Sequence, residues 1–238
     1  MSCEALTEKG KYRKMKKELK WAICIFSFLY FLCLAIALKV KDVQIIGPYN
    51  VEIGLASVNA WFRKLCNYDN GIGYSAFWYY FSQVMVFLAM ALSLFWIGLG
   101  VYQYSKDRDS SDIDKSLIAT YGLYILALLF FLIYRKLSIN NGPVPLPGKD
   151  GTGVSFPSFH AMLFLVAMGS TIYLSGYFLE DHKVSKKLIL MIRIFFAFLM
   201  VLGIFARIIS GVEWITDLLG GICFTVPLLV IYSFFCDV

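Results

Sequence analysis

The chain has 238 residues, of which 59% are hydrophobic and only 16% charged, and its mean hydropathy is +0.70. Soluble domains are roughly half apolar and a quarter charged, so this composition excludes a soluble globular protein and predicts an integral membrane protein. The net charge is +6 and seven Lys and Arg residues lie in segment 1–20, just before an apolar run, which favours attraction to anionic lipid headgroups over nucleic-acid binding.

Six apolar stretches approach or exceed the roughly 18–20 residues that a helix needs to cross a bilayer. Because neither a repeat nor a long linker divides the chain, we expect one all-α domain at 21–238, a bundle of six transmembrane helices that follows a basic tail at 1–20. The predicted spans are Trp21–Val40, Ala76–Tyr102, Ser116–Tyr134, Ala161–Tyr177, Leu188–Ala206 and Leu218–Phe235.

The first apolar stretch has two interpretations. The small residues Ala35 and Ala37 follow a basic and then an apolar segment, a pattern that also occurs at the cleavage site of a signal peptide. The apolar run is longer than a typical signal sequence contains, which favours a retained membrane anchor.

The distribution of Lys and Arg predicts the orientation of the bundle. The tail and the loops 104–116 and 178–188 together hold thirteen of these residues, whereas the opposite side holds eight. Since cytoplasmic flanks carry the excess of positive charge, we expect a multi-pass plasma-membrane protein with both termini in the cytoplasm.

Two outer segments differ from the spans. In the segment 41–75, apolar residues recur at helical spacing, which predicts an amphipathic helix in the membrane interface before the second span; these residues are Ile53, Leu55, Val58, Trp61, Phe62 and Leu65. The segment 140–160 is rich in proline and glycine, which excludes a regular helix. Its backbone must therefore lie at the outer surface or against protein.

Ionisable and hydroxyl side chains gather at three points that this topology places on the outer face. Arg135 ends the third span, Ser158 and His160 precede the fourth, and Arg207 ends the fifth. Phosphoryl transfer needs positioned cations around the phosphate oxygens, a nucleophile in line with the leaving group, and an acid. These four side chains could supply all of this except the nucleophile.

The order and spacing of these residues resemble the type 2 phosphatidic acid phosphatase family of six-span lipid phosphatases. The family pattern is Lys, six residues, Arg-Pro; then Pro-Ser-Gly-His; then Ser-Arg, five residues, His, three residues, Asp. This chain has Arg135, six residues, Gly142-Pro143; then Pro157-Ser158-Phe159-His160; then Ala206-Arg207, five residues, Glu213, three residues, Asp217.

The resemblance implies a role for each matching residue. His160 would be the general acid that protonates the leaving group, Ser158 and Arg207 would hold phosphate oxygens, and Arg135 would replace the first-motif lysine with its charge retained. Asp217 matches the aspartate that orients the nucleophile. The family further implies a metal-independent mechanism without a cofactor, and membrane lipids such as phosphatidic acid, phosphatidylglycerol phosphate or polyprenyl diphosphate as substrates.

The chain departs from the family pattern at four positions. Glu213 stands where the family has its nucleophilic histidine, Gly142 replaces an arginine, Ala206 a serine, and Phe159 a glycine. Arg135 and Arg207 would thus face two acidic residues, Glu213 and Asp217, which leaves no net charge to attract a phosphate. These acids are four residues apart, and on one helical turn they would lie close enough to share a proton.

These residues are compatible with three functions. The first is a lipid phosphate phosphatase in which Glu213, as a carboxylate acceptor or as a base toward water, replaces the histidine. The alternative is an impaired pseudophosphatase that binds or presents a lipid phosphate. A transporter is a weaker rival, since it predicts charges deep within several spans and only Arg193 approaches this.

Overall fold

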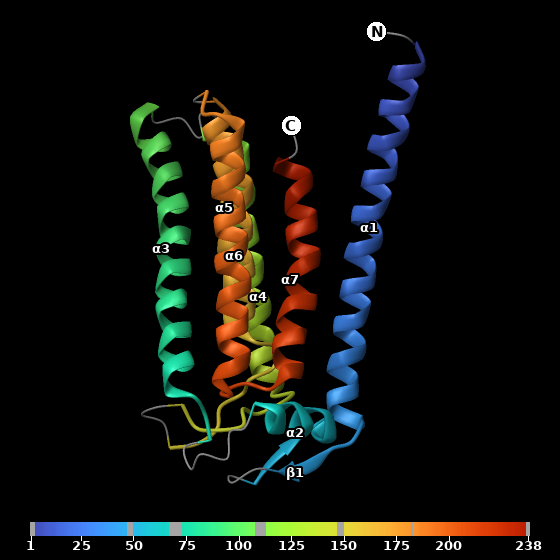
Figure 1. Ribbon diagram of the computed structural model, residues 1–238, viewed down its shortest axis with the longest axis vertical. Helices are drawn as coiled ribbons and strands as arrows, with labels where there is room; N and C mark the ends of the chain where they lie inside the picture. The colour runs from blue at the N-terminus through green and yellow to red at the C-terminus, as the bar shows by residue number, and fades with distance from the viewer. Residues whose placement is uncertain are drawn as a thin grey trace.

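A computed structural model describes residues 3–46, 50–66, 73–107, 113–146, 150–181 and 183–236, without the side chains of 3–14 and 181. It consists of six long helices and a small cap of two strands and one short helix (Figure 1). The long helices are α1 (Cys3–Val40), α3 (Ala76–Asp107), α4 (Lys115–Leu137), α5 (Phe159–Asp181), α6 (Lys186–Ser210) and α7 (Ile215–Cys236).

All six long helices are apolar enough to cross a membrane, which confirms the six-span prediction. Each helix contains its predicted span and extends past it, because backbone hydrogen bonding continues where the side chains become polar. The helix α1 has 38 residues, a length of about 57 Å at 1.5 Å per residue. It is continuous through residue 20. Because the whole helix is longer than the roughly 30 Å of a hydrocarbon core, its N-terminal part extends beyond the core.

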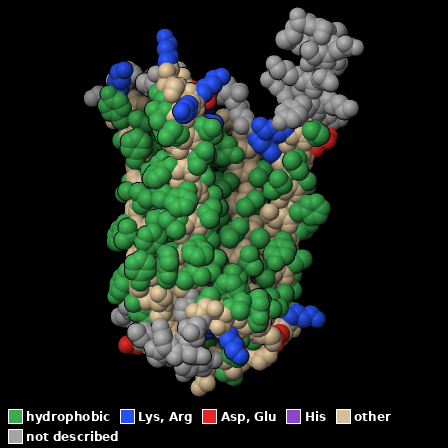
Figure 2. All heavy atoms as spheres, viewed as in Figure 1, with side chains coloured by type: hydrophobic (Ala, Val, Ile, Leu, Met, Phe, Trp, Pro, Cys, Tyr) green, Lys and Arg blue, Asp and Glu red, His purple; other side chains and the backbone are tan. Residues whose placement is uncertain are grey.

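The helix α5 is the central element of the bundle. It contacts α3, α4, α6 and α7, while α1 packs mainly against α7 at one edge (Figure 1). Figure 2 shows hydrophobic side chains over the length of the helices, with Lys and Arg near the two ends. This distribution is the one that a bilayer requires, since lipid tails solvate the middle and headgroups the ends.

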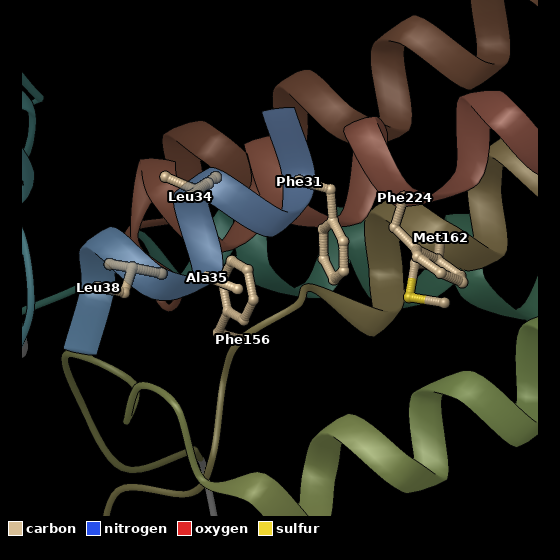
Figure 3. Packing of buried hydrophobic residues seen from close by; sticks show 7 residues of the cluster. All are labelled: Phe31, Leu34, Ala35, Leu38, Phe156, Met162 and Phe224. Atoms are coloured by element: carbon tan, nitrogen blue, oxygen red, sulfur yellow. The ribbon is translucent and has the colours of Figure 1, made fainter. Parts of the chain in front are cut away.

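Aromatic side chains join α1 to the segment that leads into α5. Phe31 is completely buried and stacks on Phe156 at 5.8 Å between ring centroids, and it also meets Phe224 of α7 at 5.2 Å (Figure 3). Phe156 lies two residues before Ser158, so this cluster helps to fix the start of α5. The C-terminal half of α1 therefore supports a loop more than a hundred residues away in the sequence.

The cap lies at the end of the bundle opposite the two termini (Figure 1). It contains a hairpin of β1 (Gln44–Ile46) and β2 (Val51–Ile53), paired antiparallel with Gln44 opposite Ile53, which the sequence did not predict. The short helix α2 (Ala56–Leu65) follows and confirms the helix expected before the second span.

A helix in a soluble protein buries its apolar face and exposes its polar face, whereas α2 does the reverse. Val58, Trp61 and Leu65 are 49%, 61% and 62% exposed, whereas the polar Asn59 is 1% exposed. An apolar face that points away from the protein suits a helix in the membrane interface. Asn59 points inward because its side-chain oxygen accepts hydrogen bonds from the backbone and hydroxyl of Thr216, in the first turn of α7.

Candidate active site

The proline- and glycine-rich segment folds back on itself at the end of the bundle where the cap lies. Asn141 pairs with Val154 in an antiparallel bridge, and the Gly142 backbone donates to the Gly153 carbonyl at 2.8 Å. These bonds satisfy backbone groups that cannot face lipid. The prediction of irregular structure is thus confirmed for the described residues, and the fold-back places the residues after Arg135 next to those before His160.

The turn between α6 and α7 brings Glu213 back over the end of α6. Gly211 has φ of 75°, a conformation that glycine adopts without strain, and it ends α6. Trp214 anchors the turn, since it is 3% exposed, packs against the cap hairpin, and donates from its indole nitrogen to the Asn141 carbonyl at 2.7 Å. Glu213 is consequently held between Arg207 and the start of α5.

One carboxylate oxygen of Glu213 joins the polar groups of the second and third motifs. Its Oε1 accepts hydrogen bonds from Arg207 Nη2 at 2.8 Å and Arg207 Nε at 2.9 Å, and lies 2.9 Å from His160 Nδ1. The second oxygen, Oε2, is buried and has no hydrogen-bond partner among the described residues. Arg207, Glu213 and His160 therefore form a compact cluster in which the acid is the central member.

Arg207 is held on all sides by protein. It is 1% exposed, its Nη1 donates to the Ser82 hydroxyl of α3 at 3.4 Å, and its guanidinium carbon lies 5.8 Å from the Tyr79 ring centroid. A buried cation is costly without a counter-ion, which Glu213 supplies. Burial alone would raise the pKa of Glu213, but the charge of Arg207 and then the interaction with His160 hold its pKa far below the ordinary range. Glu213 is therefore ionised at neutral pH.

Asp217 and Ser158 make a second set of contacts beside this cluster. Asp217 is completely buried, accepts a hydrogen bond from the Asn140 side chain at 3.1 Å and one from the Trp214 backbone at 3.4 Å. Ser158 is also buried; its backbone donates to the Asp217 carbonyl at 2.9 Å and its hydroxyl accepts from the Ala161 backbone at 3.2 Å. These contacts fix the starts of α5 and α7.

This arrangement differs from the expected pairing of the two acids. Glu213 precedes α7, which begins at Ile215, so the two carboxylates are not on one helical turn. They accept hydrogen bonds from different groups, and no hydrogen bond joins the two carboxylates in the described part of the chain. The reason is the turn at Gly211, which directs Glu213 toward α6. The shared proton stays a prediction.

A cavity of about 210 Å³ lies beside the cluster. Arg135, His160, Arg207 and Glu213 line it, together with Phe131, Phe159, Ser155, Pro157 and residues of the 142–154 segment and Val212. Asp217 and Ser158 are not among its lining residues. Arg135 has no carboxylate partner in the described part of the chain, and its guanidinium carbon lies 6.0 Å from the Phe131 ring centroid. The charges of Arg207 and Glu213 cancel. The described lining residues therefore carry one net positive charge, that of Arg135, whereas the sequence predicted no net charge.

The overall arrangement is similar to that of a solved lipid phosphatase, a transmembrane PAP2 type phosphatidylglycerolphosphate phosphatase from Bacillus subtilis. The TM-score is 0.61 over 89% of this chain and 94% of that chain, at 19% sequence identity. The chain has the PAP2 type phosphatase fold. No family model and no curated protein matches the sequence itself.

Besides Glu213, two further departures from the family pattern, Gly142 and Phe159, lie in the cavity wall of this PAP2 type fold. A Cβ atom on Gly142 would meet its nearest neighbours, the Gly153 and Val212 carbonyl oxygens, at an ordinary 3.6 Å, so a larger residue fits there at the Cβ atom. Phe159 packs on Phe131 with 4.5 Å between ring centroids, and this pair forms an aromatic side of the cavity.

Several polar residues that position the site in this PAP2 type fold were not predicted from the sequence. Asn140 connects the Gly54 backbone of the cap to Asp217, and Ser82 reaches Arg207 from α3. A side chain that joins segments this far apart carries no local pattern. Among the described residues, no three His, Cys, Asp or Glu side chains lie close enough together to hold a metal ion.

Proposed function

We propose that this protein hydrolyses the phosphate ester of a phosphorylated lipid headgroup at the outer face of the plasma membrane, with both termini in the cytoplasm. The observation that supports this most directly is the cluster of Arg207, Glu213 and His160 beside the cavity that Arg135 also lines. Phosphatidic acid, phosphatidylglycerol phosphate and polyprenyl diphosphate are the substrate classes that the PAP2 type fold suggests.

The cavity offers the groups that phosphoryl transfer needs. Arg135 provides an uncompensated cation for the phosphate oxygens, and His160 provides a proton-transfer group at the cavity wall. Arg207 lends a second guanidinium whose charge is shared with Glu213. Ser158 and Asp217 are positioning residues in this proposal, since their contacts hold the starts of α5 and α7 in place.

A second function is favoured by one specific observation. Glu213 places a carboxylate oxygen on the Nε and Nη2 donors of Arg207 and beside His160 Nδ1, and an oxygen of a bound phosphate would otherwise use such donors. A site filled in this way suits a pseudophosphatase, which binds or presents a lipid phosphate through Arg135 without turning it over.

The test is phosphate release by the purified protein in detergent, measured on a panel of lipid phosphates. The wild type is expected to release phosphate, and His160→Ala to lose on the order of 10² or more in kcat. His182→Ala is the matched histidine control. His182 lies outside the described residues and on the predicted cytoplasmic side, so the phosphate release of this variant is expected to equal that of the wild type.

The variant Glu213→His separates the two functions. Phosphate release by Glu213→His, with none from the wild type, would establish the pseudophosphatase and contradict the proposed hydrolysis. Glu213→His combined with Gly142→Arg restores two family residues at once, and the structure has room for the added side chain at the Cβ position.

A further inference from the structure

The identity of the nucleophile is open because Glu213 replaces the histidine that the family uses. A covalent route needs two groups in the site: one to bond to phosphorus, and another to protonate the leaving oxygen. The titratable side chains in the cavity wall that change charge readily are His160 and Glu213. Their contacts decide which role each can take.

Glu213 is poorly suited to attack phosphorus. Its Oε1 already serves both Arg207 nitrogens and His160, and its Oε2 is buried. The neighbouring charges hold its pKa low, and weakly basic oxygens are weak nucleophiles. Its negative charge also opposes the approach of a phosphate dianion.

His160 has one nitrogen committed and one available. An ionised carboxylate only accepts hydrogen bonds, so the proton of the bond between His160 and Glu213 lies on Nδ1. The other nitrogen, Nε2, has no hydrogen-bond partner among the described residues, and the side chain is 17% exposed at the cavity. A carboxylate that fixes the tautomer and orientation of an imidazole in this way is the arrangement that prepares a histidine for proton transfer.

The hydroxyl groups near the cavity do not offer a better nucleophile. The Ser155 hydroxyl donates to the Asn140 carbonyl at 3.4 Å, and Ser158 is completely buried. If His160 Nε2 itself bonded to phosphorus, no other titratable acid in the described cavity wall would remain to protonate the leaving alkoxide.

We propose that the reaction is a single displacement by water, in which His160 Nε2 protonates the leaving oxygen, the attacking water passes its proton to a phosphoryl oxygen, and no phosphorylated enzyme forms. This inference rests on the proposed hydrolysis. Glu213 acts as a positioning residue, because it holds His160 and balances the imidazolium charge without touching the substrate.

The step is balanced without any further reactant. The water oxygen forms a bond to phosphorus, and the water proton passes to an oxygen of the phosphoryl group. The bond between phosphorus and the lipid oxygen breaks with its electron pair on that oxygen, which takes a proton from His160 Nε2. His160 then regains a proton from the phosphate product, so that a lipid phosphate and one water become a lipid alcohol and inorganic phosphate, and His160 and Glu213 return to their starting states.

The stereochemistry at phosphorus tests this inference. A substrate found in the phosphate-release panel is prepared as a chiral phosphorothioate with one ¹⁸O and hydrolysed by the full-length protein in H₂¹⁷O. One displacement inverts the configuration, whereas two displacements through a phosphoenzyme retain it. We expect inversion. Release with retention overturns this inference and leaves the proposed function standing; an absence of any phosphate release overturns both.

Steady-state kinetics of Glu213→Gln give an independent readout. The amide keeps the size of the side chain but neither orients the imidazole nor balances its charge, so kcat is expected to fall on the order of 10³-fold. KM is expected to stay equal or fall, because a negative charge beside the phosphate is gone. A purely structural role would raise KM as kcat falls, and that result, or an unchanged kcat, would overturn the inference.

Discussion

At the scale of the residue, burial of the ion pair of Glu213 and Arg207 carries a large desolvation free energy. Arg207 is 1% exposed and the Glu213 side chain 8% exposed, so each charge relies on the other for the interactions that water would otherwise supply. The neighbouring Ser82, Tyr79 and His160 complete the set of contacts. Removal of one partner of such a pair leaves an unpaired charge in the protein interior.

We predict that Glu213→Gln lowers the free energy of unfolding on the order of 3 kcal/mol at neutral pH, and that this loss depends on pH in one direction. The folded pKa of Glu213 lies below its ordinary unfolded value of about 4.3. Its charge therefore stabilises the fold fully above that unfolded value, and the contribution disappears as the pH falls toward the folded pKa.

Thermal unfolding in detergent, compared for wild type and Glu213→Gln, measures this effect. The difference in Tm should narrow below about pH 4, where Glu213 becomes protonated in the unfolded protein. The exposed Asp42, whose pKa is also lowered, chiefly by hydrogen bonds from Ser57, contributes equally to both proteins and cancels. A difference that stays constant down to about pH 3 would mean that the Glu213 charge does not stabilise the fold.

At the scale of the element, the cap determines how the helices meet at the end of the bundle opposite the termini. The Gly54 backbone lies against the end of α1 and donates to the Asn140 side chain at 3.3 Å. Asn140 in turn donates to Asp217, and Asn59 accepts from Thr216. The cap therefore connects α1, the segment after α4 and the first turn of α7.

We predict that Gly54→Ala destabilises the protein by roughly 1–3 kcal/mol. The added Cβ atom would lie 1.8 Å from the Leu38 carbonyl oxygen and 2.4 Å from its carbon, and these backbone atoms cannot move without shifting α1 or the hairpin. Unfolding of the variant by heat or denaturant in detergent measures the loss.

Gly98→Ala is the matched control, because nothing lies within 4 Å of a Cβ atom at that position in α3. Alanine there is expected to be neutral or to stabilise the helix by up to about 1 kcal/mol. Equal stabilities of the two variants would show that Gly54 is not in close contact with α1.

At the scale of the whole molecule, the even number of spans places both ends of the chain at one end of the bundle and the cap and cavity at the other (Figure 1). The excess of Lys and Arg on the side of the termini predicts that this side is cytoplasmic. The proposed function requires the cavity to face outward, so the orientation can be tested independently of activity.

We predict that a membrane-impermeant maleimide labels Cys66 in intact cells. Cys66 directly follows α2 on the cap side and is partly exposed, whereas Cys236 ends α7 at the opposite end of the bundle. In single-cysteine variants, Cys66 should react at once and Cys236 only after the membrane is permeabilised. The reverse pattern would invert the orientation without changing the fold.

The sequence predicted the secondary structure of the spans and the order of the site residues well. The reason is local: a long apolar segment in lipid can satisfy its backbone only as a helix, and the motif residues stand at the ends of those helices. The predicted topology places Arg135, His160, Arg207 and Glu213 at one end of the bundle. In the structure all four line one cavity. The roles of these residues in chemistry stay predictions.

The sequence by itself determined the six helices, the amphipathic helix before the second span, and the charges available at the outer face, because these depend on composition and on short-range spacing. Only the tertiary structure decided that Glu213 pairs with Arg207 and His160, and that Asp217 pairs with Asn140. Carboxylates four residues apart can face one another or diverge, and the choice depends on the turn at Gly211 and on partners from distant helices. Contacts of that kind are set by how the helices pack, which no local pattern records.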